Sequence, residues 1–203
     1  MAGILKVDQV QSDSNLAFAI AGSNVAFMNA TSLQMVGSNV SLAGTNVITN
    51  GKVVSSGMPV GSVLQVVQGI TTTETSTSSS SYVDTGLSAT ITPSSASSKI
   101  LIALVHTENE KTAGSASNRI GMSLLRNGSA ILGGTSFTSG NLYTASAVLL
   151  RGNIAFNYLD SPASTSALTY KTQFRSNDGT SQVSVQVNGA ASPSTMILME
   201  IAA

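Results

Sequence analysis

Apolar positions divide the chain into two regions that differ in the length and spacing of their hydrophobic stretches. Residues 1–57 contain short apolar pieces separated by Gly, Ser and Asn. Residues 58–203 contain longer stretches in which apolar and polar residues alternate, as in β-strands that bury one face. No stretch has a convincing helical period. The pattern predicts an all-β chain in which a repetitive, β-rich N-terminal stalk (1–57) precedes a C-terminal head (58–203).

The head region is predicted to form a series of strands separated by turn signals. Asn127-Gly128 is the strongest short signal for a hairpin, and the Thr/Ser tract at 71–81 is predicted to be an exposed loop or edge. So many strands in about 145 residues suit a β-sandwich or a jelly roll. The predicted strands are 63–68, 82–92, 99–106, 120–124, 130–132, 145–158, 168–175, 182–188 and 195–201.

Two of these strands are strongly apolar. Residues 100–105 read Ile-Leu-Ile-Ala-Leu-Val, an unbroken apolar run that is typical of a strand covered on both faces. Residues 195–201 close the chain, and we expect Ile197 and Met199 to supply the core of the head. Val183, Val185 and Val187 are predicted to point one way from a half-buried strand.

The N-terminal region contains three near-copies of one short motif. Gly22-Ser23-Asn24-Val25, Gly37-Ser38-Asn39-Val40 and Gly44-Thr45-Asn46-Val47 share a turn-forming start and a Val that can point into an interior. Asn50-Gly51 adds a predicted tight turn. Each unit is too small to bury its own apolar face, because a lone hairpin is marginally stable in water. A flexible linker is the alternative, but the apolar content favours order within an intertwined homotrimer.

Composition agrees with a chain that is covered by copies of itself or by a larger assembly. Charged residues make up only 9% of the chain, with nine basic against nine acidic residues and a net charge of zero. No basic surface for nucleic acid or anionic membrane is expected. There is no cysteine, no signal-peptide core near Lys6 and Asp8, and no apolar window long enough to cross a bilayer. A neutral secreted adhesin is the alternative interpretation.

The side chains that carry chemistry are few. In an extended strand, His106, Glu108 and Glu110 would lie on one side and form a candidate divalent-metal group. The alternative is a solvated strand end, and we favour it, so no metal or cofactor is expected. No Ser lies in a nucleophile-elbow pattern, and a sugar-stacking groove is not visible in a chain without Trp. The sequence therefore favours a non-enzymatic protein.

Long polar loops are better candidates for recognition, because binding residues tend to lie on loops held by a rigid scaffold. The loops predicted for the head are 107–118, 133–143 and 159–167. The candidate receptor-contact residues in them are Asn109, Lys111, Asn118, Phe137, Asn141, Tyr143 and Asp160.

Several segments resemble structural proteins of marine and cyanobacterial tailed phages. The N-terminal segments are Met1–Gln11 and Ala26–Thr31. The head segments are the Ser/Thr tract, Tyr82–Leu87, the Pro93–Ile100 turn that leads into a strand, and the terminal Met196–Ile201. The resemblance covers most of the chain but contains no catalytic signature.

This resemblance implies a fibre or decoration protein of the virion, made in the host cytoplasm and assembled as a homotrimer. It implies attachment to a phage capsid or tail protein through the N-terminus, at Ile4, Leu5, Lys6, Val7 and Asp8. It also implies that the head points outward to a glycan or protein of the host cell surface, without membrane insertion. The chain is shorter than long tail fibres, so a capsid or tail decoration or connector with a purely structural role is the alternative.

Overall fold

The computed structural model covers the whole chain and describes residues 58–114, 118–133 and 146–203, together with the backbone of six strands between residues 16 and 53. The described residues form antiparallel β-sheets and contain no α-helix, which confirms the predicted all-β class. Among them, no helix is long and apolar enough to cross a bilayer. The chain divides into two units, Met1–Pro59 and Val60–Ala203.

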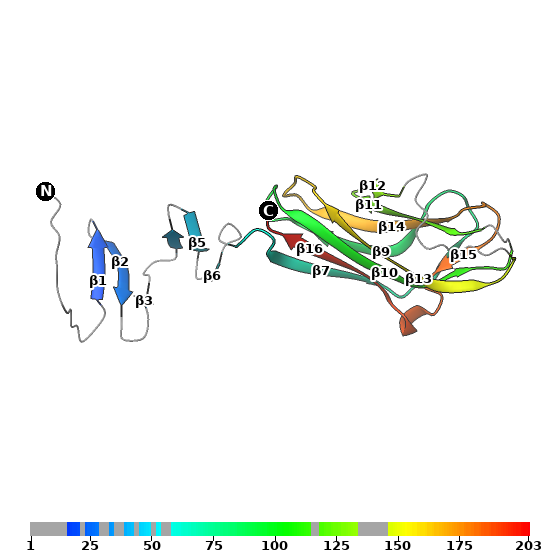
Figure 1. Cartoon of the computed structure of the whole chain (residues 1–203), viewed down its shortest axis with the longest axis horizontal. Coiled ribbons are helices and arrows are strands. Elements are labelled where there is room, and N and C mark those ends of the chain that lie inside the picture. The colour runs from blue at the N-terminus through cyan, green and yellow to red at the C-terminus, as the bar shows by residue number, and fades with distance from the viewer. Residues whose placement is uncertain are drawn as a thin grey trace. The chain divides into compact units, whose positions relative to one another are not determined.

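The first unit contains two separate three-stranded antiparallel sheets (Figure 1). The repeated motifs lie at the starts of three of its strands, β2, β4 and β5. Asn50-Gly51 lies outside the described residues, but Thr49 and Lys52 on either side of it are paired. The first sheet has the order β1 (Leu16–Ile20), β2 (Ser23–Met28), β3 (Leu33–Gln34), and the second has the order β4 (Asn39–Leu42), β5 (Thr45–Thr49), β6 (Lys52–Val53).

The second unit contains one sheet of six strands, called sheet I here, and one of four strands, called sheet II. Sheet I consists of β7 (Val63–Thr71), β8 (Thr75–Thr77), β10 (Lys99–Lys111), β13 (Leu150–Asp160), β15 (Val183–Val185) and β16 (Ser194–Ile201). Sheet II has the order β12 (Ser129–Leu132), β11 (Ile120–Arg126), β14 (Leu168–Ser176), β9 (Val83–Ile91).

Strand β10 is the longest strand and organises sheet I. It pairs with β13 along one side. On its other side, β16 pairs with Lys99–Val105 and β15 pairs with Glu110 and Lys111. A short 3₁₀ helix, η2 (Gly189–Ala191), links β15 to β16.

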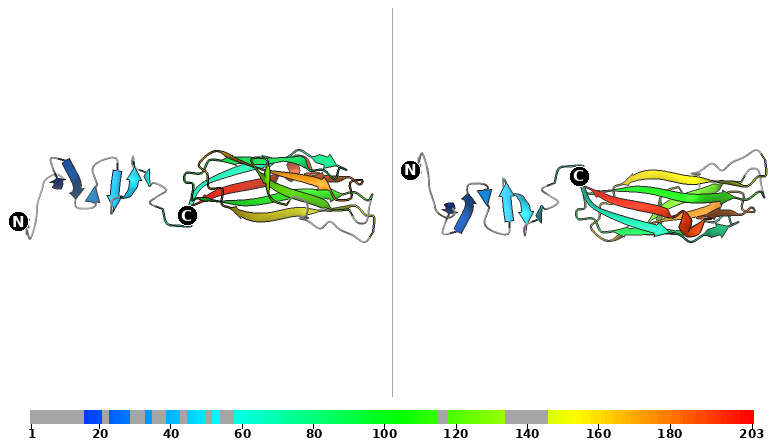
Figure 2. Two further views of the ribbon diagram at one scale, coloured as in Figure 1. Left: turned by 90° about the horizontal axis from the view of Figure 1, so that it is seen from above. Right: turned by 90° about the horizontal axis from the view of Figure 1, so that it is seen from below.

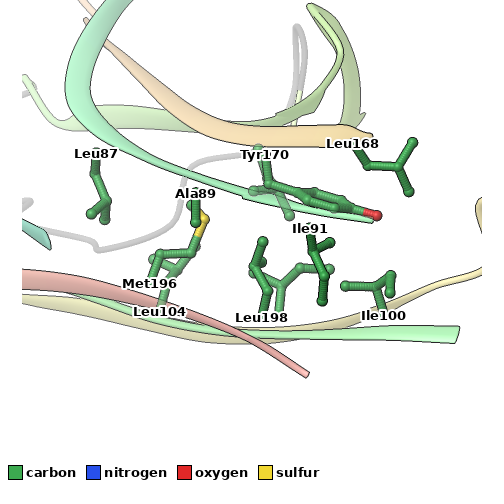
Figure 3. Packing of buried hydrophobic residues seen from close by; sticks show 11 residues of the cluster. Leu87, Ala89, Ile91, Ile100, Leu104, Leu168, Tyr170, Met196 and Leu198 are labelled. Atoms are coloured by element: carbon green, nitrogen blue, oxygen red, sulfur yellow. The ribbon is translucent and has the colours of Figure 1, made fainter. Parts of the chain in front are cut away.

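The hydrophobic core of the unit lies between the two sheets. Figure 3 shows side chains of sheet II pointing toward side chains of sheet I. Every second residue of a strand faces this interior, so Leu87, Ala89 and Ile91 of β9 meet Met196 and Leu198 of β16. A second cluster continues the core with six buried residues, Ile120, Met122, Ile154, Phe174, Val183 and Val185.

The Asn127-Gly128 hairpin is confirmed. Strands β11 and β12 pair in antiparallel fashion on either side of the turn. Both turn residues have positive φ angles, 48° at Asn127 and 84° at Gly128. Asn and Gly are the residues that adopt two such angles in succession most readily, because a two-residue hairpin needs them to match the twist of its strands.

Three strand predictions were wrong in detail. Ile197 and Met199 do not supply the core, because β16 turns Met196 and Leu198 inward instead. The segment 145–158 was predicted to be a long strand or a bent pair broken at Gly152, but β13 begins only at Leu150 and runs unbroken through Gly152 to Asp160. The strand predicted at 182–188 is limited to Val183–Val185, because Gln186 has a positive φ of 63° and turns the chain.

The second unit has two distinct ends. At the proximal end, the backbone of Gly61 donates to the carbonyl of Ala202 and the backbone of Ala202 donates to Ser62. The chain therefore enters the unit beside its C-terminus (Figure 2). The distal end lies at the far end of β10, where Lys111 pairs with Leu150. Thirteen extended residues separate the ends by about 40 Å.

Candidate functional site

The metal group proposed from His106, Glu108 and Glu110 does not form. Strand β10 has a bulge between His106 and Asn109, with Glu108 at a positive φ of 49°. A bulge shifts the alternation of side chains by one residue. His106 therefore faces the core, whereas Glu110 forms an ion pair with Arg151 at 2.6 Å. The described residues contain no group of three ionisable side chains arranged to hold a metal.

His106 takes part in a buried chain of hydrogen bonds that crosses between the sheets. Its Nε2 lies 2.9 Å from the hydroxyl of Thr172, which lies 2.6 Å from the hydroxyl of Thr85. All three side chains are inaccessible to solvent. Nδ1 of His106 has no hydrogen-bond partner among the described residues. Burial opposes the charged form and lowers the pKa of His106 to about 4.

This burial predicts a pH-dependent stability. The unfolded chain takes up the proton near pH 6.5 and the folded chain near pH 4, so stability falls as the pH is lowered between these values. Between pH 7 and pH 5 we expect a loss of about 2 kcal/mol in unfolding free energy. A His106→Gln variant, which cannot titrate, is expected to lack this loss in urea unfolding at the two pH values.

The acids with shifted pKa values do not contribute to this loss of stability. Their ordinary pKa values are 3.8 to 4.5, and Asp84, Asp178 and Glu200 all have lowered pKa values, so their contribution is retained above pH 5. Equal losses for the wild type and His106→Gln between pH 7 and pH 5 would contradict the assignment to His106.

Two candidate receptor contacts in the predicted 107–118 loop are part of the framework. Strand β10 extends through Lys111, so residues 107–111 are not a loop. Asn109 and Lys111 are fully buried, and Asn109 donates from Nδ2 to the carbonyl groups of His106 and Gly152. These bonds satisfy backbone groups that the bulge leaves without a ladder partner. Neither side chain is accessible to a receptor.

Asn118 is also buried, and it ties two loops together. Its Oδ1 accepts from the backbone of Asn177 at 3.1 Å and of Asp178 at 3.2 Å, and its Nδ2 donates to the carbonyl of Ser181. Asp178 in turn accepts from the backbone of Thr180 and Ser181. Burial raises the pKa of Asp178, but these hydrogen bonds outweigh it and hold the pKa well below its usual range.

Asp160, another of the candidate receptor contacts, is also buried. Its two carboxylate oxygens accept from the same nitrogen of Arg126, Nη1, at 2.7 and 2.9 Å, and one of them also accepts from the hydroxyl of Tyr170 at 2.7 Å. Tyr170 is fully buried, and burial together with the bond to Asp160 raises the pKa of its hydroxyl. The group fastens β13 to sheet II, so Asp160 is not a surface contact.

The predicted recognition loops also lie at opposite ends of the unit. Asp160 pairs with Ile100 at the proximal end, so residues 161–167 are found there. Residues 112–114 follow Lys111 at the distal end, and Asn118 and Arg119 precede β11 there. Phe137, Asn141 and Tyr143 lie outside the described residues, as do the predicted attachment residues Ile4, Leu5, Lys6, Val7 and Asp8. One surface cannot include both loops.

At the distal end, the Ser/Thr tract that follows β7 joins two loops in one polar surface. Ser176 donates from its backbone to Ser79, and Thr112 donates to Gln182. The Arg175 guanidinium lies 4.9 Å from the centre of the Tyr82 ring, a cation–π contact that fixes the end of the tract. We call this surface, residues 76–82, 112–114 and 177–182, the distal polar surface.

The distal polar surface contains a shallow hollow of about 260 Å³ lined by Ser76, Thr77, Ser78 and Gln182. Its lining offers hydroxyl and amide groups and no charge. The sequence predicted an exposed loop or edge strand at 71–81. Part of this tract, β8, is an edge strand of sheet I, which confirms the second alternative there. The position of the tract beside 177–182 is set by long-range pairing of β8 with β15, which no local pattern reveals.

No protein-family model matches the chain, and no curated protein matches its sequence significantly.

Proposed function

We propose that the chain is a non-enzymatic virion protein of a tailed phage, a short homotrimeric fibre whose β-sandwich head contacts the host surface. The resemblance of its N-terminal and head segments to phage structural proteins supports the class. Two antiparallel sheets around a shared core support the sandwich. The ionisable groups described above form hydrogen bonds or ion pairs within the framework, which agrees with a structural role.

The observation that carries the proposal is that the chain enters the head at one end of β10, whereas the distal polar surface lies at the other end. The chain enters the head at the proximal end, where Gly61 and Ser62 bond to Ala202. The distal polar surface lies about 40 Å away at the other end. A fibre that is attached through its N-terminal part needs such an arrangement, because the contact surface must lie away from the point of attachment.

The chemistry of the distal polar surface favours a neutral polar ligand. Ser76, Ser78 and Gln182 are exposed and supply hydroxyl and amide groups, with no charged side chain lining the hollow. Such groups both donate and accept hydrogen bonds, which matches the hydroxyl groups of a sugar. We therefore take a host surface glycan as the ligand class.

The ligand class is tested with an array of bacterial surface polysaccharides and the purified full chain. The triple variant Ser76→Ala/Ser78→Ala/Gln182→Ala is expected to bind at least about tenfold more weakly than the wild type, since each lost hydrogen bond contributes about 0.5–1.5 kcal/mol. The control is Thr165→Ala/Ser166→Ala in the exposed proximal loop, which should bind as the wild type does. Equal binding by all three proteins would reject the distal polar surface as the contact site.

A further inference from the structure

The outward face of four neighbouring strands in sheet I is mostly apolar and carries no charged residue over three rows. The register places Val66, Met199, Leu101 and Leu159 side by side on β7, β16, β10 and β13. A second row contains Gln68, Ile197, Ala103 and Asn157, and a third contains Ile70, Thr195, Val105 and Ala155. We call these twelve residues the outer face.

The outer face is open in the single chain. Val66 is 60% exposed, Ile70 is 55% exposed and Leu159 is 50% exposed. The alternate residues of the same strands, such as Ile102 and Leu198, are fully buried in the core. The apolar run at residues 100–105 therefore has one covered face and one uncovered face, although its sequence is typical of a strand covered on both.

Sheet II provides a comparison within the same unit. Its outward residues include Asp84, Ser88, Thr90, Lys171 and Gln173, and Asp84 pairs with Lys171 at 2.8 Å. That face has the polar character of a sheet that meets water on one side. The two sheets share one core and one chain, so the apolar character of the outer face is specific to sheet I.

Size and charge indicate what covers the outer face. Four strands about 4.8 Å apart and three rows about 6.7 Å apart give roughly 400 Å², which is about half of what one partner contributes to a standard interface. The largest apolar patch on a soluble monomer has about this size and is often functional. None of its twelve residues is charged, so it offers nothing to an ionic partner. An uncharged, mostly apolar face suits contact with the same face of other copies of this chain, which can meet around a shared axis.

We infer that the outer faces of neighbouring copies pack against one another and form the head part of the subunit interface. This inference rests on the proposed homotrimer and identifies the surface that assembles it. The remaining contact area comes from other parts of the chain, since the outer face alone is smaller than a standard interface. The low content of charged residues, 9%, agrees with a chain whose surface is covered in this way.

The test measures the mass of the full chain by light scattering after size-exclusion chromatography. The wild type is expected at three times 20.6 kDa, about 62 kDa. Ala103→Lys places a charge at the centre of the outer face and is expected to shift the mass to about 21 kDa at the same protein concentration. Ser88→Lys is the matched control on the outward side of sheet II, and it should keep the mass of the wild type.

A second variant guards against misfolding at Ala103. Val66→Lys/Leu159→Lys changes two side chains that are already at least half exposed in the single chain, so the fold should tolerate both. Circular dichroism checks that each variant is folded. A folded outer-face variant that keeps the mass of the wild type would overturn the interface and leave the trimer standing. A monomeric wild type would overturn the trimer and the interface together.

Discussion

Replacing Glu200 by alanine is expected to lower the unfolding free energy by about 3–4 kcal/mol. The carboxylate is fully buried and accepts four hydrogen bonds. Gln65 donates at 2.6 Å, Ser98 donates from its hydroxyl at 2.7 Å, and Ser94 donates from both its backbone and its hydroxyl at 2.7 Å. A bond to a charged group contributes about 1.5–3 kcal/mol. Only Ser98 is a buried donor, and water can replace the carboxylate at Gln65 and at the exposed Ser94, so the total loss stays below the sum of four bonds.

Burial of Glu200 opposes ionisation, but these hydrogen bonds outweigh it and lower the pKa of the carboxyl. Glu200→Gln keeps the shape of the side chain but replaces one acceptor oxygen by an amide group that faces donors. We therefore expect its unfolding free energy to lie between those of the wild type and Glu200→Ala. Thermal unfolding should show a drop of roughly 10 °C for Glu200→Ala. Glu74→Ala, at an exposed position, is the control and should change the midpoint little.

Glu200 also connects two segments that lie far apart in the sequence. The two segments are Pro93–Ile100 and Met196–Ile201. Ser94 and Ser98 of the first bond to the carboxylate of the second. The serine-rich turn is therefore held by a buried acid about a hundred residues later. Sequence reasoning found both segments but could not connect them, because the connection depends on the pairing of β10 with β16.

The elements that local patterns determine were predictable. Alternation indicated most strands of the head, and Asn127-Gly128 indicated its hairpin, because period and turn chemistry are properties of neighbouring residues. Which face of a strand points into the core was harder to predict from the sequence. In Thr195–Ile201 both sets of alternate residues are mostly apolar, and the charged Glu200 lies in the inward set, so the pattern did not show that Met196 and Leu198 face inward.

Predictions of the site failed where a single irregularity changed the geometry. The bulge after His106 reverses the faces of the residues that follow, so Asn109 and Lys111 point into the core and Glu110 points to Arg151. No residue in 106–110 is a Gly or Pro that would have indicated the bulge. Polar composition alone then suggested a solvated loop. The polar side chains of this stretch instead satisfy buried backbone groups.

Gly69→Ala is expected to destabilise the head by about 3 kcal/mol, because a side chain at this position would collide with the backbone of the other sheet. Gly69 lies in β7 of sheet I, and a Cβ atom placed on it would lie 2.1 Å from the carbonyl oxygen of Ser88 in β9 of sheet II. The obstacle is backbone, so no side-chain rotation relieves it. One of the two sheets must move, and the movement disturbs the core between Leu87 and Leu198.

Gly121→Ala is the matched control. Gly121 is also a buried strand residue of ordinary φ, but the atoms nearest to its added Cβ belong to the flexible side chain of Arg175, at 3.1 Å. That side chain can shift, so the control should cost much less. In urea unfolding, Gly69→Ala should show a clearly lower midpoint than Gly121→Ala with a similar dependence on urea concentration. Equal midpoints would mean that β7 and β9 have room to separate at Gly69, and the close approach of the two sheets would then not limit the fold.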